Sequence, residues 1–314
     1  MSRSHFGNIG VLMGGYSSER DISLRSGAAV SGALGTAGYA VKAVDINTSD
    51  RLKIIGLIKE LRIDVAFIAL HGRLGEDGQI QSILEELDIP YTGSGPTASQ
   101  KAFNKITAQG VFKSAGLSVP ENFYITNGEL VHFKEAFTVL KKLPFVVKAA
   151  CEGSSIGISM VRHPSQWEGA LRDALSYGPY VIVEKFIKGR EVTAGVFNGE
   201  ALPLVEIVIH NPLFDYNSKY QKGLTNYVVP ADLSETLTKN IQEMAVSAYN
   251  VISCEGFARV DIRIDEAGKP YILELNTIPG FTETSLFPKA AAKGGYNFLK
   301  VCERLLEIAY GKKI

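Results

Sequence analysis

The chain has 314 residues, which is enough for roughly two or three domains that each bury a core of their own. Hydrophobic residues make up 46% of it, and 33 Lys and Arg side chains balance 33 Asp and Glu side chains. This balance argues against general attraction to nucleic acid or to an anionic membrane, and it leaves small molecules as the expected partners.

The longest apolar runs, such as residues 65–70, are far shorter than the roughly 20 residues of a membrane-spanning helix. The first residues are polar and lead into an apolar strand, without a signal-peptide pattern. Cys151, Cys254 and Cys302 are odd in number and widely spaced, and no CxxC motif is present. These features predict a cytoplasmic protein with reduced thiols, no zinc site and no membrane partner.

The first third of the chain alternates between strand and helix patterns. A buried strand at residues 8–13 turns through Gly14 and Gly15 into a helix, which Ser17 or Ser18 could N-cap. We then expect a strand at 40–46, a helix at 51–61, a strand at 64–70, a glycine-rich loop at 71–78 and a helix at 79–89. This alternation predicts a doubly wound parallel sheet, and the turn-rich residues 90–99 mark its end.

After a helix at residues 101–116, the pattern changes to strands bounded by Gly, Pro and charged turns. The runs are PFVVKAA, GISMVR, YVIVEKFI, REVTAGVFNG, ALPLVEIVI, FARVDIRID and PYILELN. They predict a largely antiparallel α+β arrangement with helices on one side, and the chain closes with amphipathic helices.

Two of these strands, residues 257–265 and 270–276, are joined by a short turn and predict a hairpin. Strict alternation puts Glu274 and Asn276 on one face with Ile272, and it puts Leu273 on the opposite face. Folding at the turn sets Asp261 approximately opposite Glu274.

Asp261, Glu274 and Asn276 therefore offer oxygen ligands of the kind that Mg²⁺ or Mn²⁺ prefers. The alternative is a solvated face on which Asp261 pairs with neighbouring Arg259 or Arg263. The small residues around Gly280 favour an active-site loop beside this group.

Lys148 ends a strand and precedes the small-residue loop AACEGSSIG, which could close over phosphates. Neither a Walker A motif nor a Rossmann GxGxxG motif is present, so an ordinary turn remains open. Glu184 to Ile187 could offer backbone groups to a purine, and Glu191 could bind its ribose or form a surface salt bridge.

Several motifs, taken in order, resemble those of the ATP-grasp ligases, and specifically those of the D-alanine–D-alanine ligase family. They occupy residues 12–27, 69–81, 90–95, 147–158, 183–193, 214–220, 258–262 and 273–286. The resemblance implies an ATP-grasp fold with an N-terminal parallel-sheet (preATP-grasp) domain. It divides the chain into an N-terminal substrate domain at 1–97, a central ATP-grasp subdomain with the glycine loop at 98–182, and a C-terminal subdomain at 183–314.

The resemblance also implies a reaction in which the carboxylate of one D-alanine attacks the γ-phosphate of ATP. The amine of a second D-alanine then displaces phosphate from the acyl phosphate to give D-alanyl-D-alanine, a peptidoglycan precursor. The resemblance further implies that the site binds two Mg²⁺ or Mn²⁺ ions and that the protein forms a homodimer. A related ligase that uses another acceptor, such as D-serine, and a nucleotide-binding regulatory protein remain alternatives.

The family's site residues map onto this chain by matching motifs. The resemblance implies that Lys105, Lys148 and Lys219 contact the phosphates of ATP and that Ser155 also belongs to the ATP site. It assigns the adenine to Glu184, Lys185, Phe186 and Ile187, and the ribose to Glu191. It implies that Asp261, Glu274 and Asn276 bind the metal ions. The residues that it implies for substrate binding and acyl transfer are Glu19, His71, Ser154, Tyr220, Arg259, Gly280, Ser285 and Leu286.

The chain departs from the usual family pattern at several positions. Ala149, Ala150 and Cys151 follow the phosphate lysine, where proline and polar residues are common, and Asn104 and Phe186 stand where Asp and Trp are common. None of the metal or acyl-transfer positions is lost. The resemblance therefore implies an active ligase, and Tyr220 favours peptide rather than ester formation.

Overall fold

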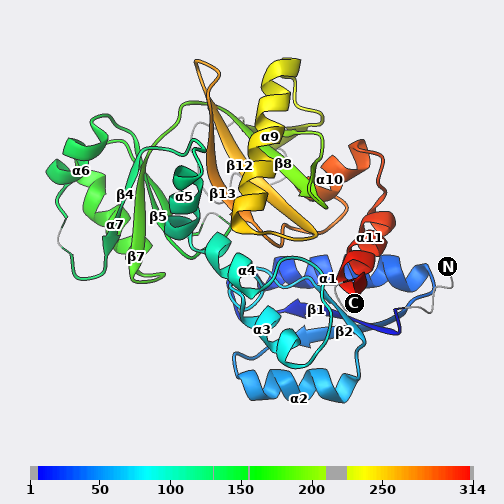
Figure 1. The fold of residues 1–314 in the computed structure, drawn as a ribbon. Coiled ribbons are helices and arrows are strands. Elements are labelled where there is room, and N and C mark those ends of the chain that lie inside the picture. Colours follow the sequence, from blue (N-terminus) through cyan, green and yellow to red (C-terminus); the bar gives the residue numbers. More distant parts are fainter. Residues whose placement is uncertain (1–5, 130, 155, 210–224, 312–314) are drawn as a thin grey trace.

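The structure is a computed structural model that describes residues 6–129, 131–154, 156–209 and 225–311. Its strands form three sheets that follow one another along the chain (Figure 1). No helix within these described ranges is both long enough and apolar enough to cross a membrane.

The first sheet is parallel, with the strand order β2-β1-β3. Its strands are β1 (Asn8–Gly14), β2 (Ala40–Ile46) and β3 (Val65–Ile68), and its helices are α1 (Arg20–Thr36), α2 (Arg51–Leu61) and α3 (Gln79–Glu86). Helices α1 and α2 lie on opposite sides of this sheet, and the C-terminal helix α11 (Phe298–Gly311) packs beside α1 (Figure 1). Because both faces are covered, β1 and β3 are apolar almost throughout. The predicted doubly wound parallel unit is confirmed.

Helix α1 begins later than its sequence suggests. Its N-cap is Glu19, which makes no capping bond with its side chain, so the prediction of a cap by Ser17 or Ser18 is wrong. The Ser17 hydroxyl instead donates to the carbonyl of His71 at 2.8 Å and accepts from the Glu19 amide at 3.2 Å. The serine is thus used to join the start of α1 to the loop after β3.

The second sheet is antiparallel and has the order β4-β7-β5-β6. Its strands are β4 (Asn122–Thr126), β5 (Phe145–Ala149), β6 (Ile158–Val161) and β7 (Tyr180–Lys185). Helices α6 (Phe133–Leu140) and α7 (Trp167–Leu175) pack on one face around Phe145 and Trp167. Alternation along β5 and β7 therefore turns Lys148 and Glu184 toward the other face.

The third sheet is also antiparallel, with the order β11-β10-β8-β12-β13 and with β9 (Glu200–Ala201) paired to β8. Its main strands are β8 (Gly189–Phe197), β10 (Val205–Ile209), β11 (Thr225–Val228), β12 (Phe257–Asp265) and β13 (Pro270–Asn276). One face packs on α4 (Pro96–Phe103), α5 (Lys105–Ser114) and α9 (Glu235–Ile252), as a cluster that includes Val192, Val260 and Ile262. The opposite face carries Thr193 and Asp261, and α10 (Leu286–Lys293) follows the loop after β13.

Strand β13 contains a bulge that strict alternation did not predict. Asp261 pairs with Glu274 and Ile262 pairs with Ile272, so Leu273 is the extra residue. Ile272 packs into the core with Leu275, and it does not share the face of Glu274. The bulge is supported by Gln109 of α5, whose amide donates to the carbonyl of Leu273 at 3.2 Å.

Candidate active site

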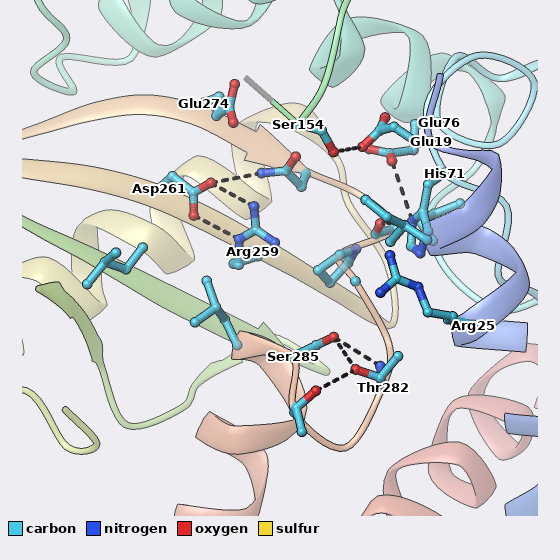
Figure 2. A pocket seen from close by; sticks show the side chains of 18 of the residues that line it. Glu19, Arg25, His71, Glu76, Ser154, Arg259, Asp261, Glu274, Thr282 and Ser285 are labelled. Carbon is cyan, nitrogen blue, oxygen red and sulfur yellow. Dashed lines mark hydrogen bonds and ion pairs between the residues drawn. The ribbon is translucent and has the colours of Figure 1, made fainter. Parts of the chain in front are cut away.

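Two cavities meet at the hairpin of β12 and β13. The larger cavity has a volume of about 290 Å³ and lies among α1, the loop after β13 and the start of α10 (Figure 2). The smaller cavity has a volume of about 70 Å³ and lies between the second and third sheets. Asp261 and Glu274 line both cavities, so these carboxylates stand where ligands in the two cavities would approach each other.

The cavities divide the residues singled out from the sequence into two groups. The larger is lined by Glu19, His71, Ser154, Arg259, Asp261, Glu274, Asn276, Gly280, Ser285 and Leu286. The smaller is lined by Lys148, Glu184, Lys185, Phe186, Ile187 and Glu191, together with the two shared carboxylates. Asp261 and Glu274 form the wall that the two cavities share, and Lys105 contacts this shared wall through Glu274. Ser155, Lys219 and Tyr220 lie outside the described residues.

The hairpin brings the carboxylate and amide side chains together, and it also pairs Asp261 with a neighbouring arginine. Asp261 lies opposite Glu274, and the Asn276 amide donates to Asp261 Oδ2 at 3.2 Å. Arg259 donates to the same carboxylate through Nε at 2.8 Å and through Nη2 at 2.7 Å (Figure 2). The Thr193 hydroxyl donates to Asp261 Oδ1 at 2.7 Å and fixes the carboxylate from β8. Convergence and ion pairing, which the sequence left as alternatives, occur together.

The side-chain oxygen atoms of Asp261, Glu274 and Asn276 suit a hard divalent cation that also binds ligands from outside the protein. Two carboxylates and one amide converge here, and no group of three or more His, Cys, Asp or Glu side chains in the described part of the chain is arranged to hold a metal ion by itself. A magnesium-type ion bound here would therefore take its remaining ligands from water or phosphate oxygens.

Lys105 Nζ lies 3.2 Å from Glu274 and also bonds to the carbonyl of Glu152. Burial by itself lowers the pKa of Lys105, but the Glu274 carboxylate reverses this effect and the pKa is raised on balance. Lys105 therefore holds a fixed positive charge at the wall shared by the two cavities.

The smaller cavity contains two ion pairs. Lys148 Nζ lies 2.6 Å from Glu184, with both side chains nearly fully buried, and Gln109 also bonds to Glu184. Arg263 lies 3.1 Å from Glu191, and its guanidinium sits 4.9 Å from the centre of the Phe186 ring. Burial lowers the pKa of Arg263, and Glu191 opposes that effect. The cavity combines apolar walls with polar groups that are held in place.

In the larger cavity, Glu19 at the start of α1 meets the glycine-rich loop after β5, of which residues 150–154, 156 and 157 are described. The Ser154 hydroxyl donates to the Glu19 carboxylate, which is only 8% exposed (Figure 2). Burial raises the pKa of Glu19, the neighbouring Glu76 raises it further, and the bond from Ser154 lowers it. A buried carboxylate beside a second one is a favourable place for a ligand's ammonium group.

His71 is held by bonds at both ring nitrogens. Its Nε2 lies 2.9 Å from the Ser26 hydroxyl and its Nδ1 lies 3.0 Å from the carbonyl of Ile278. Those contacts join α1 and the loop after β3 to the loop after β13. The ring thus fixes the wall of the cavity.

The opposite wall of the larger cavity is built by the loop after β13. Ser285, the N-cap of α10, accepts from the Thr282 amide at 3.1 Å and lies 2.8 Å from its hydroxyl. A side chain on Gly280 would come within 3.3 Å of Ser285, so the glycine keeps this wall open. The backbone and hydroxyl groups here could receive a carboxylate or an oxyanion.

Sequence reasoning did not single out several residues of the site. Glu76 lies within the loop at residues 71–78, and its presence there was the only available signal. Gln109 belongs to an amphipathic helix, where nothing marks it as the partner of Glu184. Arg25 and Thr282 also line the larger cavity (Figure 2).

Solved structures with the same architecture define the class of protein. The crystal structure of D-alanine–D-alanine ligase from Bacillus anthracis complexed with ATP matches with a TM-score of 0.85 and 30% identity, over 98% of each chain. The structure of the D-alanine–D-alanine ligase from Coxiella burnetii matches with a TM-score of 0.84 and 27% identity, over 98% of this chain and 94% of that one. The protein is therefore a ligase with the ATP-grasp fold.

Sequence comparisons narrow the class to a family. A family model described as D-ala D-ala ligase C-terminus matches residues 111–307, and one described as D-ala D-ala ligase N-terminus matches residues 49–94. The D-alanine–D-alanine ligase of Pelotomaculum thermopropionicum is 44% identical over 311 residues, covering 96% of both chains. That of Desulforudis audaxviator is 44% identical over 305 residues, covering 96% of this chain and 98% of the relative. The chain belongs to the D-alanine–D-alanine ligase family.

Proposed function

We propose that this enzyme joins two D-alanine molecules in an ATP-dependent reaction that passes through an acyl phosphate. The observation that supports this most is the shared wall, where Asp261 and Glu274 line both cavities. ATP in the smaller cavity would direct its γ-phosphate toward this wall, and the first D-alanine in the larger cavity would meet it there. The proposed use of ATP and the proposed product, a cell-wall precursor, support a cytoplasmic location for this reaction.

The smaller cavity would hold the nucleotide. Residues 184–187 supply backbone groups for the adenine, and Glu191, steadied by Arg263, faces the ribose. Lys148 and Lys105 approach the phosphates from two sides of the site. Both lysines now pair with carboxylates, so phosphate binding would rearrange or share these ion pairs.

Asp261, Glu274 and Asn276 would hold the magnesium or manganese ions that the reaction needs. When bound, such ions neutralise the negative charge that builds on the phosphate oxygens. Thr193 and Arg259 both donate to Asp261, so the Asp261 carboxylate is already oriented before a cation arrives.

Glu19 would bind the ammonium group of the first D-alanine and aim its carboxylate at the shared wall. Arg259 and the Gly280 amide would stabilise the oxyanion formed when the second amine attacks. Ser285 and Leu286 would receive the carboxylate of that second D-alanine at the N-terminal end of α10, where the backbone dipoles favour an anion. The contact between Ser154 and Glu19 holds the loop over the site and keeps out water.

Turnover measurements test this proposal directly. With ATP, Mg²⁺ and D-alanine, the purified enzyme should release one ADP for each D-alanyl-D-alanine formed, and L-alanine should not replace D-alanine. Glu274→Gln should lower kcat by at least about 10²-fold, because charge stabilisation at the phosphates is lost. The circular-dichroism spectrum should stay that of the unchanged enzyme, while the unfolding temperature should fall because buried Lys105 loses its carboxylate partner. Equal ADP release with unrelated carboxylic acids would show that the substrate assignment is wrong.

A further inference from the structure

The side chain of Arg73, in the loop at residues 71–78 of the first domain, forms a second bridge to the glycine-rich loop after β5. Arg73 lies in the loop after β3, and its Nη2 atom is 3.3 Å from Glu152 Oε1. The same Nη2 donates to the carbonyl of Tyr177 at 2.9 Å. The Glu152 side chain is only 12% exposed, whereas that of Arg73 is 46% exposed, so the bridge lies at the edge of the closed site.

These two contacts reach both ends of the glycine-rich loop. Glu152 lies at its beginning, next to Gly153 and Ser154, and its carbonyl accepts from Lys105. Tyr177 packs against its far end, because a Cβ atom on Gly157 would lie 2.8 Å from the tyrosine ring. One guanidinium therefore fixes the start of the loop directly and its end through the residue that packs on it.

The Arg73 bridge differs from the other link between these parts of the chain. The Ser154 bond uses Glu19, the carboxylate to which we assign the substrate ammonium, so that link shares its acceptor with the substrate. Arg73, Glu152 and Tyr177 do not line either cavity. Their contacts can persist through both chemical steps.

We infer that Arg73 is a positioning residue that holds the glycine-rich loop closed over the acyl phosphate by binding Glu152 and the carbonyl of Tyr177. This inference rests on the proposed ligase function. When the loop opens too early, water adds to the acyl phosphate and releases inorganic phosphate, and the first D-alanine regains its carboxylate. One ATP is then consumed without a peptide bond.

The test is the ratio of ADP to dipeptide, measured with Arg73→Gln, Glu152→Gln and the double variant. An ion pair of this exposure shifts the balance between closed and open loop by roughly twofold to fivefold, so hydrolysis without dipeptide should rise by a similar factor. The double variant should be no worse than the more affected single variant, because both substitutions remove the same bridge. Arg51→Gln is the matched control, since Arg51 also pairs with a glutamate, at 2.6 Å, and is 49% exposed.

The outcomes separate the inference from the function on which it rests. If the unchanged enzyme makes no dipeptide, the proposed function is wrong, whatever the variants do. If the unchanged enzyme and Arg51→Gln make one dipeptide per ADP and both bridge variants keep that ratio, the role of Arg73 is refuted. A lower kcat with an unchanged ratio also refutes it, because a merely structural residue would give that result.

Discussion

Gly153 provides a sharp test of the position of Glu19. A Cβ atom at residue 153 would lie 2.5 Å from Glu19 Oε2 and 2.9 Å from its Cδ, whereas ordinary contacts begin at 3.4 Å. An alanine therefore needs the carboxylate or the loop to move by about 0.9 Å. Because Glu19 is buried, its carboxylate cannot simply turn into solvent.

A displacement of about 1 Å in a positioning group can cost about 10² in rate, which is about 2.7 kcal/mol of transition-state stabilisation. We therefore expect Gly153→Ala to lower kcat/KM for D-alanine by about 10²-fold. The assay is the initial rate of dipeptide formation at saturating ATP, with D-alanine varied.

Gly169→Ala is the matched control for this substitution. Gly169 lies in α7, and a Cβ atom there meets nothing within 4 Å. Alanine at this exposed helical position should keep full activity and stabilise the fold by about 0.5–1 kcal/mol. If Gly153→Ala retains kcat/KM within about twofold of the unchanged enzyme, then the loop does not press on Glu19, and the proposed positioning of this carboxylate is refuted.

Three further predictions concern buried groups. Burial raises the pKa of Glu19, so its ionisation costs stability progressively as the pH rises above the ordinary pKa of 4.5, and the full penalty is present above the raised pKa. Glu19→Gln should therefore raise the melting temperature at pH 8, the gain should vanish below pH 4.5, and a pH-independent difference would contradict this. Lys148→Met leaves Glu184 buried without its cation and should lower the free energy of unfolding in urea by about 3 kcal/mol, whereas a loss below about 1 kcal/mol would show that the pair is dispensable. Thr193→Val removes a bond to Asp261 and should weaken Mn²⁺ binding, measured by titration with ATP present, by about 10-fold to 100-fold, and unchanged binding would rule out this orienting role.

The acidic hairpin shows how far the sequence could lead. A short turn and alternating strands were enough to predict that Asp261 would face Glu274, because both features are local. The bulge at Leu273 could not be predicted in this way, since the contact made there comes from Gln109 of α5, which is distant in sequence. Register in a sheet responds to such tertiary contacts, whereas alternation describes only a regular strand.

The ion pairs show a second limit. The family resemblance assigned Lys148 and Glu184 separately to the nucleotide, but it gave no reason to expect them to pair. Their contact follows from the antiparallel pairing of β5 with β7, which brings both side chains to one face of the sheet. Likewise, the side chain of Ser17 looked like a helix cap, yet the loop carbonyl of His71 competes for its hydroxyl. Local propensity cannot rank such competing partners.

The most direct measurement of the central claim follows an oxygen atom from substrate to product. In the proposed mechanism, the carboxylate of the first D-alanine attacks the γ-phosphate of ATP at the wall formed by Asp261 and Glu274. With D-alanine labelled by ¹⁸O in its carboxylate, mass spectrometry should find one labelled oxygen in the inorganic phosphate for each dipeptide formed. Phosphate that carries no label, in an enzyme that makes dipeptide, would contradict the acyl phosphate and the arrangement of the site derived from it.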